Sequence, residues 1–176
     1  ELIVTLRGHS NKIWTATFSP DGQHIATAGF DHTARLWSSL DGRPLATLEH
    51  TDVVDAVQFS PDGRYIVTAS WDHTARIWSA ADGHLIAILQ GHTDKLIAAA
   101  FSPDSQYIVT ASADHTAKVW SVPNCNILAT LNGHADQIWE ATFSPDGQYI
   151  VTASLDQTAR VWRLLTLGDL ERILAE

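Results

Sequence analysis

The feature that most constrains the fold of this chain is an internal repeat of about 42 residues. The motif Phe-Ser-Pro-Asp occurs four times, and successive copies are separated by 41, 42 and 42 residues. The copies begin at Phe18, Phe59, Phe101 and Phe143. Such a period indicates one structural unit built four times, with each unit burying its apolar face against its neighbours.

Each unit predicts short β-strands. Runs such as residues 66–70 and 74–78 are rich in β-branched and aromatic side chains, and Ser-Pro-Asp-Gly or Asp-Gly turns bound most of these runs. Four short strands in about 42 residues is the spacing of one propeller blade. We therefore expect an all-β fold, a β-propeller with four blades of four antiparallel strands.

The polar residues of the repeat resemble the pattern of a known repeat family. Gly-His pairs occur at 8–9, 91–92 and 133–134, and in every unit an Asp precedes a Trp by six residues. Over residues 2–162 this pattern resembles the WD-repeat family. The resemblance implies a structural hydrogen-bond network in each blade, in which Ser links His and Asp to the Trp ring nitrogen. The expected network residues are His9, Asp31, Trp37, His50, Ser70, Asp72, Trp78, His92, Ser112, Asp114, Trp120, His134, Ser154, Asp156 and Trp162.

Two units depart from this pattern. Gly29 stands where the serine is expected in the first unit, so we expect its network to lack the middle member. In the second unit Glu49 replaces the glycine before His50. We expect these two units to be less rigid than the others.

A catalytic reading of the same residues must be weighed. His, Ser and Asp together could form a nucleophile with its base, but an enzyme needs one such set and units two to four each carry one. The nine histidines show no compact metal-ligand spacing, and no phosphate-binding glycine loop is present. We expect no enzyme activity, no catalytic residues, no metal and no cofactor.

Function is expected where the units differ. The three tryptophans outside the repeat network, at 14, 71 and 139, fall at two repeat positions, five residues after the repeat His or just before the turn Asp. The resemblance implies that both positions open onto the top face around the central channel. An exposed aromatic patch favours an interaction surface, although packing between blades is the alternative. The expected partner-binding residues, here called the top-face set, are Trp14, Phe30, Asp55, Trp71, Ile97, Trp139 and Leu155.

The predicted function is a non-catalytic scaffold that presents this aromatic face to a peptide or protein. Asp55, Asp94, Asp136 and Glu140 would give the face an acidic rim that favours a basic partner. The alternative function is a purely structural or self-assembling repeat segment of a larger multidomain protein.

Residues 2–6 match the outer-strand runs at 44–48, 85–89 and 127–131, whereas the last unit lacks such a run after Trp162. We expect residues 2–6 to complete the last blade, within the chain or in a second chain. Three assemblies remain open: a closed ring of four blades, a homodimer forming an eight-bladed ring, and a fragment of a longer propeller. The expected blades span about 8–48, 49–90, 91–132 and 133–162 within a domain of residues 1–162, and 163–176 form a tail with a possible short helix.

Composition excludes several partners. The net charge is −9 and the 11 basic residues are scattered, which argues against nucleic acid. No apolar run is long enough for a membrane helix. The single cysteine, Cys125, excludes an internal disulfide and favours a cytoplasmic location.

Overall fold

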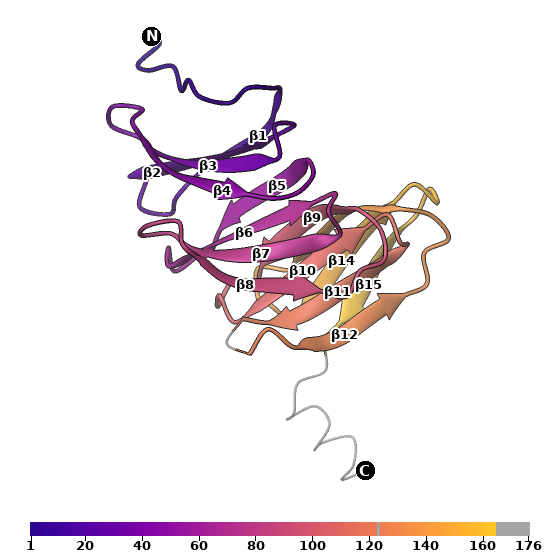
Figure 1. Ribbon diagram of the computed structural model, residues 1–176. Helices are drawn as coiled ribbons and strands as arrows, with labels where there is room; N and C mark the ends of the chain where they lie inside the picture. Colours follow the sequence, from indigo (N-terminus) through magenta and orange to yellow (C-terminus); the bar gives the residue numbers. More distant parts are fainter. Residues whose placement is uncertain (123, 165–176) are drawn as a thin grey trace.

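The computed structural model describes residues 1–122 and 124–164, and these residues form fifteen β-strands and no helix. Figure 1 shows the strands grouped into separate sheets that follow one another along the chain. The strands are β1 (Ile13–Phe18), β2 (His24–Gly29), β3 (Thr33–Ser38), β4 (Pro44–Glu49), β5 (Val54–Phe59), β6 (Tyr65–Ser70), β7 (Thr74–Ser79), β8 (Leu85–Gln90), β9 (Leu96–Phe101), β10 (Tyr107–Ser112), β11 (Thr116–Ser121), β12 (Ile127–Asn132), β13 (Ile138–Phe143), β14 (Tyr149–Ser154) and β15 (Ala159–Arg163).

Each sheet is an antiparallel meander. Blade 1 is β1-β2-β3-β4, blade 2 is β5-β6-β7-β8, blade 3 is β9-β10-β11-β12 and blade 4 is β13-β14-β15. The innermost strands β1, β5, β9 and β13 contact one another in that order. The prediction of an all-β propeller built from four blades is therefore confirmed.

The hydrophobic core lies between the blades, because a single sheet cannot cover its own faces. One cluster joins Leu36 and Leu48 of blade 1 to Val54, Phe59 and Ile66 of blade 2, and all five are at most 5% exposed. Equivalent clusters join blades 2 and 3 and blades 3 and 4. Small residues on the inner strands, such as the alanines at 98–100, let the sheets approach closely.

Turn glycines fix how one blade sits on the next. Gly83, in the β7–β8 turn, has φ = 74°, and a Cβ there would lie 2.3 Å from the Cβ of Ala46 in β4. Only glycine gives both the left-handed backbone and this close approach. Gly42, in the β3–β4 turn, has φ = 70°, and a Cβ there would lie 2.5 Å from Val4 Cγ2 and 3.3 Å from Leu6 Cδ2. Residues 4 and 6 therefore contact the β3–β4 turn of blade 1 in the same way that β4 contacts the β7–β8 turn of blade 2.

Two details of the predicted closure differ in the structure. Residues 2–6 belong to no strand, and in the described part of the chain β15 pairs with β14 alone. Completion of the last blade within one chain is therefore wrong. The physical reason is distance, because blades 1 and 4 lie at opposite ends of the array (Figure 1), so residues 2–6 have no strand beside them to share hydrogen bonds.

The short helix expected within 163–176 falls almost entirely outside the described residues, which end at Leu164. In the part of the chain that the structure covers, no helix is long and apolar enough to cross a membrane.

Candidate protein-interaction face

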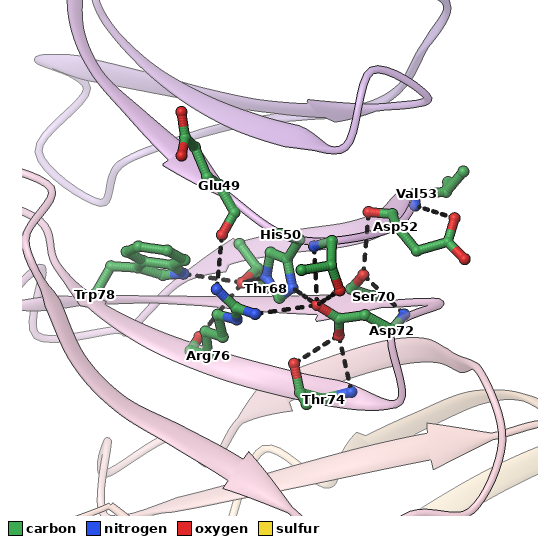
Figure 2. A network of polar contacts seen from close by, with 11 residues as sticks. Glu49, His50, Asp52, Val53, Thr68, Ser70, Asp72, Thr74, Arg76 and Trp78 are labelled. Carbon is green, nitrogen blue, oxygen red and sulfur yellow. Dashed lines mark hydrogen bonds and ion pairs between the residues drawn. The ribbon is translucent and has the colours of Figure 1, made fainter.

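A polar network crosses each blade, and Figure 2 shows the network of blade 2. His50 Nδ1 lies 2.8 Å from Asp72 Oδ2, and His50 Nε2 lies 2.7 Å from Thr68 Oγ1. Trp78 Nε1 donates to the same threonine oxygen at 2.9 Å. Asp72 also accepts the backbone N–H of Thr74 at 3.0 Å. The network is satisfied when His50 is neutral, donates from Nδ1 to Asp72 and accepts the Thr68 hydroxyl at Nε2.

The role predicted for the serines is wrong. Ser70 Oγ accepts the backbone N–H of Asp72 at 3.1 Å and donates to the Asp52 carbonyl at 3.2 Å, so it holds the turn. The residue that links the His to the Trp ring nitrogen is the threonine two positions earlier. The four linking threonines are Thr27, Thr68, Thr110 and Thr152.

The network of blade 1 is consequently complete, contrary to the expectation based on Gly29. His9 Nε2 lies 2.7 Å from Thr27 Oγ1, and Trp37 Nε1 donates to that oxygen at 2.8 Å. The sequence held the signal, because the threonine occurs in all four units and the serine in only three.

The arrangement of Thr68, His50 and Asp72 superficially resembles a nucleophile with its base, but it offers no chemistry to a substrate. The Thr68 side chain is 0% exposed and its oxygen already accepts the Trp78 indole N–H. The same holds for Thr110, which is also 0% exposed. The repeated polar set therefore satisfies buried groups and ties the strands of one blade together.

The network also shifts the ionisation of its members. Burial raises the pKa of Asp31, but hydrogen bonds from His9, Thr33 and Ser10 outweigh burial and lower that pKa from 3.8 to about 2. In Asp72 the same competition, with bonds from His50 and Thr74, leaves the pKa well below its ordinary value. Burial lowers the pKa of His50 below 6.5, partly opposed by Asp72. Both carboxylates are therefore ionised at neutral pH, and burial favours neutral His50.

The first top-face position coincides with a β-bulge in every blade. Trp14 is the extra residue between Ile13 and Thr15, where the β1–β2 register shifts. The corresponding extra residues in blades 2, 3 and 4 are Asp55, Ile97 and Trp139. A bulge bends the strand and changes the direction of one side chain. All four of these residues line one concave surface along the innermost strands, which encloses a cavity of about 630 Å³.

The second top-face position is the residue that directly follows β2, β6, β10 or β14. The backbone N–H of Phe30 donates to the Lys12 carbonyl at 2.9 Å, and that of Trp71 donates to the Val53 carbonyl at 2.9 Å. Ala113 and Leu155 make the equivalent bonds in blades 3 and 4. These bonds hold each second-position residue beside the segment that leads into the bulge.

Three aromatic rings of the top-face set form a row. Trp14 and Phe30 have ring centroids 5.5 Å apart, and Phe30 and Trp71 have centroids 6.0 Å apart across the boundary of blades 1 and 2. The Trp71 indole donates to Asp55 Oδ2 at 3.0 Å, and Lys95 Nζ of blade 3 lies 4.0 Å from the centre of the Trp71 ring. The row of rings therefore spans blades 1 and 2, and Lys95 adds a contact from blade 3.

The structure does not bring every expected residue together. Leu155 is 52% exposed but belongs neither to the aromatic row nor to the lining of the concave surface. Of the expected acidic rim, Asp55 and Glu140 line that surface. Asp94 and Asp136 instead use their carboxylates to accept the backbone N–H of the next residue. Among the described residues, no three His, Cys, Asp or Glu side chains are grouped so that they could hold a metal ion.

Comparison with known proteins agrees with this geometry. The chain matches the family described as "WD domain, G-beta repeat" four times, at residues 1–38, 42–79, 83–121 and 125–163. The chain belongs to the WD-repeat family. Each matched WD repeat from the second onward includes the outer strand of one blade and the three inner strands of the next, and the first match places residues 2–6 in the outer-strand register.

Curated relatives align with short segments of the chain. The "Serine-threonine kinase receptor-associated protein" of Gallus gallus is 40% identical over 55 residues, which is 31% of this chain and 16% of the relative. The "Small ribosomal subunit protein RACK1" of Drosophila melanogaster is 44% identical over 50 residues, 28% of this chain and 16% of the relative. "Ribosome assembly protein 4" of Chaetomium thermophilum is 46% identical over 41 residues, 23% of this chain and 8% of the relative. The aligned part is thus less than a fifth of each relative.

Proposed function

We propose that this WD-repeat chain is a non-catalytic interaction module whose top-face set binds a peptide or protein. The observation that carries the proposal is the bulge in each innermost strand, which brings residues that differ between the repeats to one concave surface. The scaffold residues of the four blades are nearly the same, so recognition must depend on these variable positions.

Exposure of large rings supports this function. Trp14 is 57% exposed and Trp139 is 45% exposed, although both lie on strands of an otherwise well-packed protein. Exposed tryptophan costs solubility and contributes nothing to the blade, whereas tryptophan is the residue most enriched in binding hot spots. Packing between blades accounts for the Phe30–Trp71 contact, but it does not account for the exposed faces of Trp14 and Trp139.

The relatives are consistent with a protein partner. The name of the Gallus gallus relative associates it with a kinase receptor, and the names of two other relatives associate them with the ribosome or its assembly. We further propose that the chain works in the cytoplasm, where its free Cys125 would stay reduced.

The test compares two triple variants in a partner screen with the immobilised chain. Trp14→Ala, Trp71→Ala and Trp139→Ala together remove the rings of the top-face set. Leu45→Ala, Ile86→Ala and Leu128→Ala form the matched control, because these outer-strand side chains are 38%, 45% and 54% exposed. We expect only the tryptophan variant to lose the bound partner while its urea-unfolding midpoint stays near that of the control. Equal partner binding by both variants would refute the proposal.

A second function, self-association into a ring, is supported by the faces of the terminal blades. Val161 on blade 4 is 71% exposed, whereas the equivalent Val119 on blade 3 is 0% exposed against blade 4. On blade 1 Phe18 is 63% exposed, whereas the equivalent Phe59 is 5% exposed against blade 1. Blade 4 of one copy and blade 1 of another would therefore form the same interface that already joins blades within the chain.

Strand exchange would accompany this contact. The edge of β15 has no neighbouring strand among the described residues, and residues 2–6 hold the outer-strand register beside blade 1. In a homodimer, residues 2–6 of each copy would pair with β15 of the other, which gives two four-bladed halves and an eight-bladed ring. Such closure would satisfy both open edges and bury both apolar faces at once.

Light scattering at micromolar concentration tests the ring. We expect twice the chain mass of 19.3 kDa. Val161→Glu should return the mass to that of one chain, because a buried carboxylate would face the apolar surface of the second copy. Leu128→Glu is the control, since Leu128 is 54% exposed on an outer strand away from the proposed contact. A wild-type mass of one chain would rule out the homodimer.

A further inference from the structure

One oxygen of the Asp55 carboxylate is buried without a hydrogen-bond partner. Asp55 is 5% exposed, and its Oδ2 accepts the Trp71 indole N–H at 3.0 Å. Its Oδ1 is buried and has no hydrogen-bond partner, and no other acidic oxygen in residues 1–122 and 124–164 is both buried and unpartnered. Leaving a buried acceptor unpaired is costly, so the position needs an explanation that the blade itself does not supply.

The repeat shows that the blade does not require this carboxylate. In the other three blades the bulge position carries Trp14, Ile97 or Trp139. Each of those blades keeps its bulge and its hydrogen-bond network without an acidic group there. Asp55 paired with Trp71 is therefore a feature of blade 2 alone within a scaffold that is otherwise repeated.

A cation already lies on the ring beside Asp55. The ammonium of Lys95 is 4.0 Å from the centre of the Trp71 ring and comes from the loop before β9, in the next blade. The indole N–H that donates to Asp55 enriches the ring in electron density, which strengthens the attraction between its face and a cation. Burial raises the pKa of Asp55 above its ordinary value, and the bond from Trp71 and the charge of Lys95 oppose this rise only in part.

We propose that Asp55 and Trp71 form a receptor for a lysine side chain of the partner, and that Lys95 occupies the Trp71 face in the unbound protein. Phe30 and Trp14 continue the aromatic row from Trp71 and would contact the lysine methylenes. Asp55 and Glu140 line the adjoining concave surface, so the approach to the receptor is negatively charged. This inference rests on the proposed function, because it names the chemistry that the top-face set recognises.

The mechanism is an exchange of one ammonium for another. Lys95 is exposed, so its side chain can move into water while the partner's lysine takes its place over Trp71. The incoming ammonium would also supply the hydrogen-bond donor that Asp55 Oδ1 lacks in the unbound protein. Lys95 is therefore a competitor, and its removal should strengthen binding.

The experiment measures binding of a fluorescein-labelled octalysine peptide by fluorescence polarisation, with the fully ε-acetylated peptide as the neutral reference. We expect the wild type to prefer octalysine. Asp55→Asn should weaken octalysine binding about tenfold, and Lys95→Ala should strengthen it by about three- to tenfold. Trp71→Phe, which keeps a ring but removes the indole N–H, should weaken binding even if Asp55→Asn fails to fold.

Matched controls separate the site from general charge attraction. Glu49→Gln removes the same charge as Asp55→Asn from an exposed side chain, and Lys12→Ala removes the same charge as Lys95→Ala from the equivalent position of the first repeat. Both controls should change binding less than twofold. The proposal is overturned if Asp55→Asn matches Glu49→Gln or if Lys95→Ala matches Lys12→Ala.

The outcome also distinguishes the receptor from the broader function. If the triple tryptophan variant loses its partner while Asp55→Asn and Lys95→Ala behave like their controls, the lysine receptor fails and the interaction face stands. If the triple variant keeps its partner, the proposed function itself fails.

Discussion

Blades 3 and 4 are nearly the same in sequence and differ in what covers them. In blade 3 Val109 pairs with Val119, and in blade 4 Val151 pairs with Val161 in the same register. Val109 and Val119 are 0% exposed, whereas Val151 is 39% and Val161 is 71% exposed. This difference shows that a blade forms from its own residues, whereas the burial of its face depends on the next blade.

The largest expected loss of stability comes from breaking the polar network, and it shows whether the network depends on a neighbouring blade packed against its own. Asp114→Ala in blade 3 removes the partner of His92 and of the Thr116 N–H, and should lower the free energy of unfolding by about 2–4 kcal/mol. Because the network lies within one blade, Asp156→Ala in blade 4 should also lower the melting temperature. Urea and thermal unfolding would check both, and a stable Asp156→Ala beside an unstable Asp114→Ala would tie the network to the neighbouring blade.

An intermediate effect is expected from the valine pair itself. Val119→Ala should cost about 2 kcal/mol, because two buried methyl groups are lost and a cavity remains. Val161→Ala should cost less than about 0.5 kcal/mol in the monomer, since its side chain is exposed. Urea unfolding across a concentration series would sharpen the comparison. A cost at Val161 that rises only where the chains associate would show that a second copy supplies the missing cover, whereas equal costs in the monomer would contradict the comparison.

The smallest effect is a dependence of stability on pH. The folded pKa of Asp31 is about 2, below an unfolded value of about 3.9, so its contribution is full above pH 4 and is lost as pH falls towards 2. His50 also has a lowered pKa, so its contribution declines as pH falls below about 6.5. Urea midpoints at pH 7, 5 and 3 should fall in that order.

Asp31→Asn provides the control for the acid step. The variant should lose less stability between pH 5 and 3 than the wild type, by about 1 kcal/mol after allowance for solvent screening. Identical losses in the two proteins would show that Asp31 does not contribute to the acid sensitivity.

Individual residues show where sequence reasoning succeeded and failed. The period and the turn motifs predicted the strands and blades, because both depend on local chemistry. The hydrogen-bond link through Thr27 was missed, because positions 27 and 29 lie on the same face of β2, and only the places of His9 and Trp37 in space decide which of the two positions reaches the indole. Completion of the last blade within one chain was also wrong, because a strand pattern in residues 2–6 says nothing of where a partner strand lies.

The sequence by itself determined the repeat, the propeller blades and the positions at which the blades differ. Only the tertiary structure decided what those positions do together. Asp55 and Trp71 belong to blade 2 and Lys95 to blade 3, and a bulge and a blade interface bring the carboxylate to the edge of the Trp71 ring and the ammonium to its face. The physical reason is that strand formation depends on neighbours in the chain, whereas exposure, ring stacking and an unpaired carboxylate depend on neighbours in space.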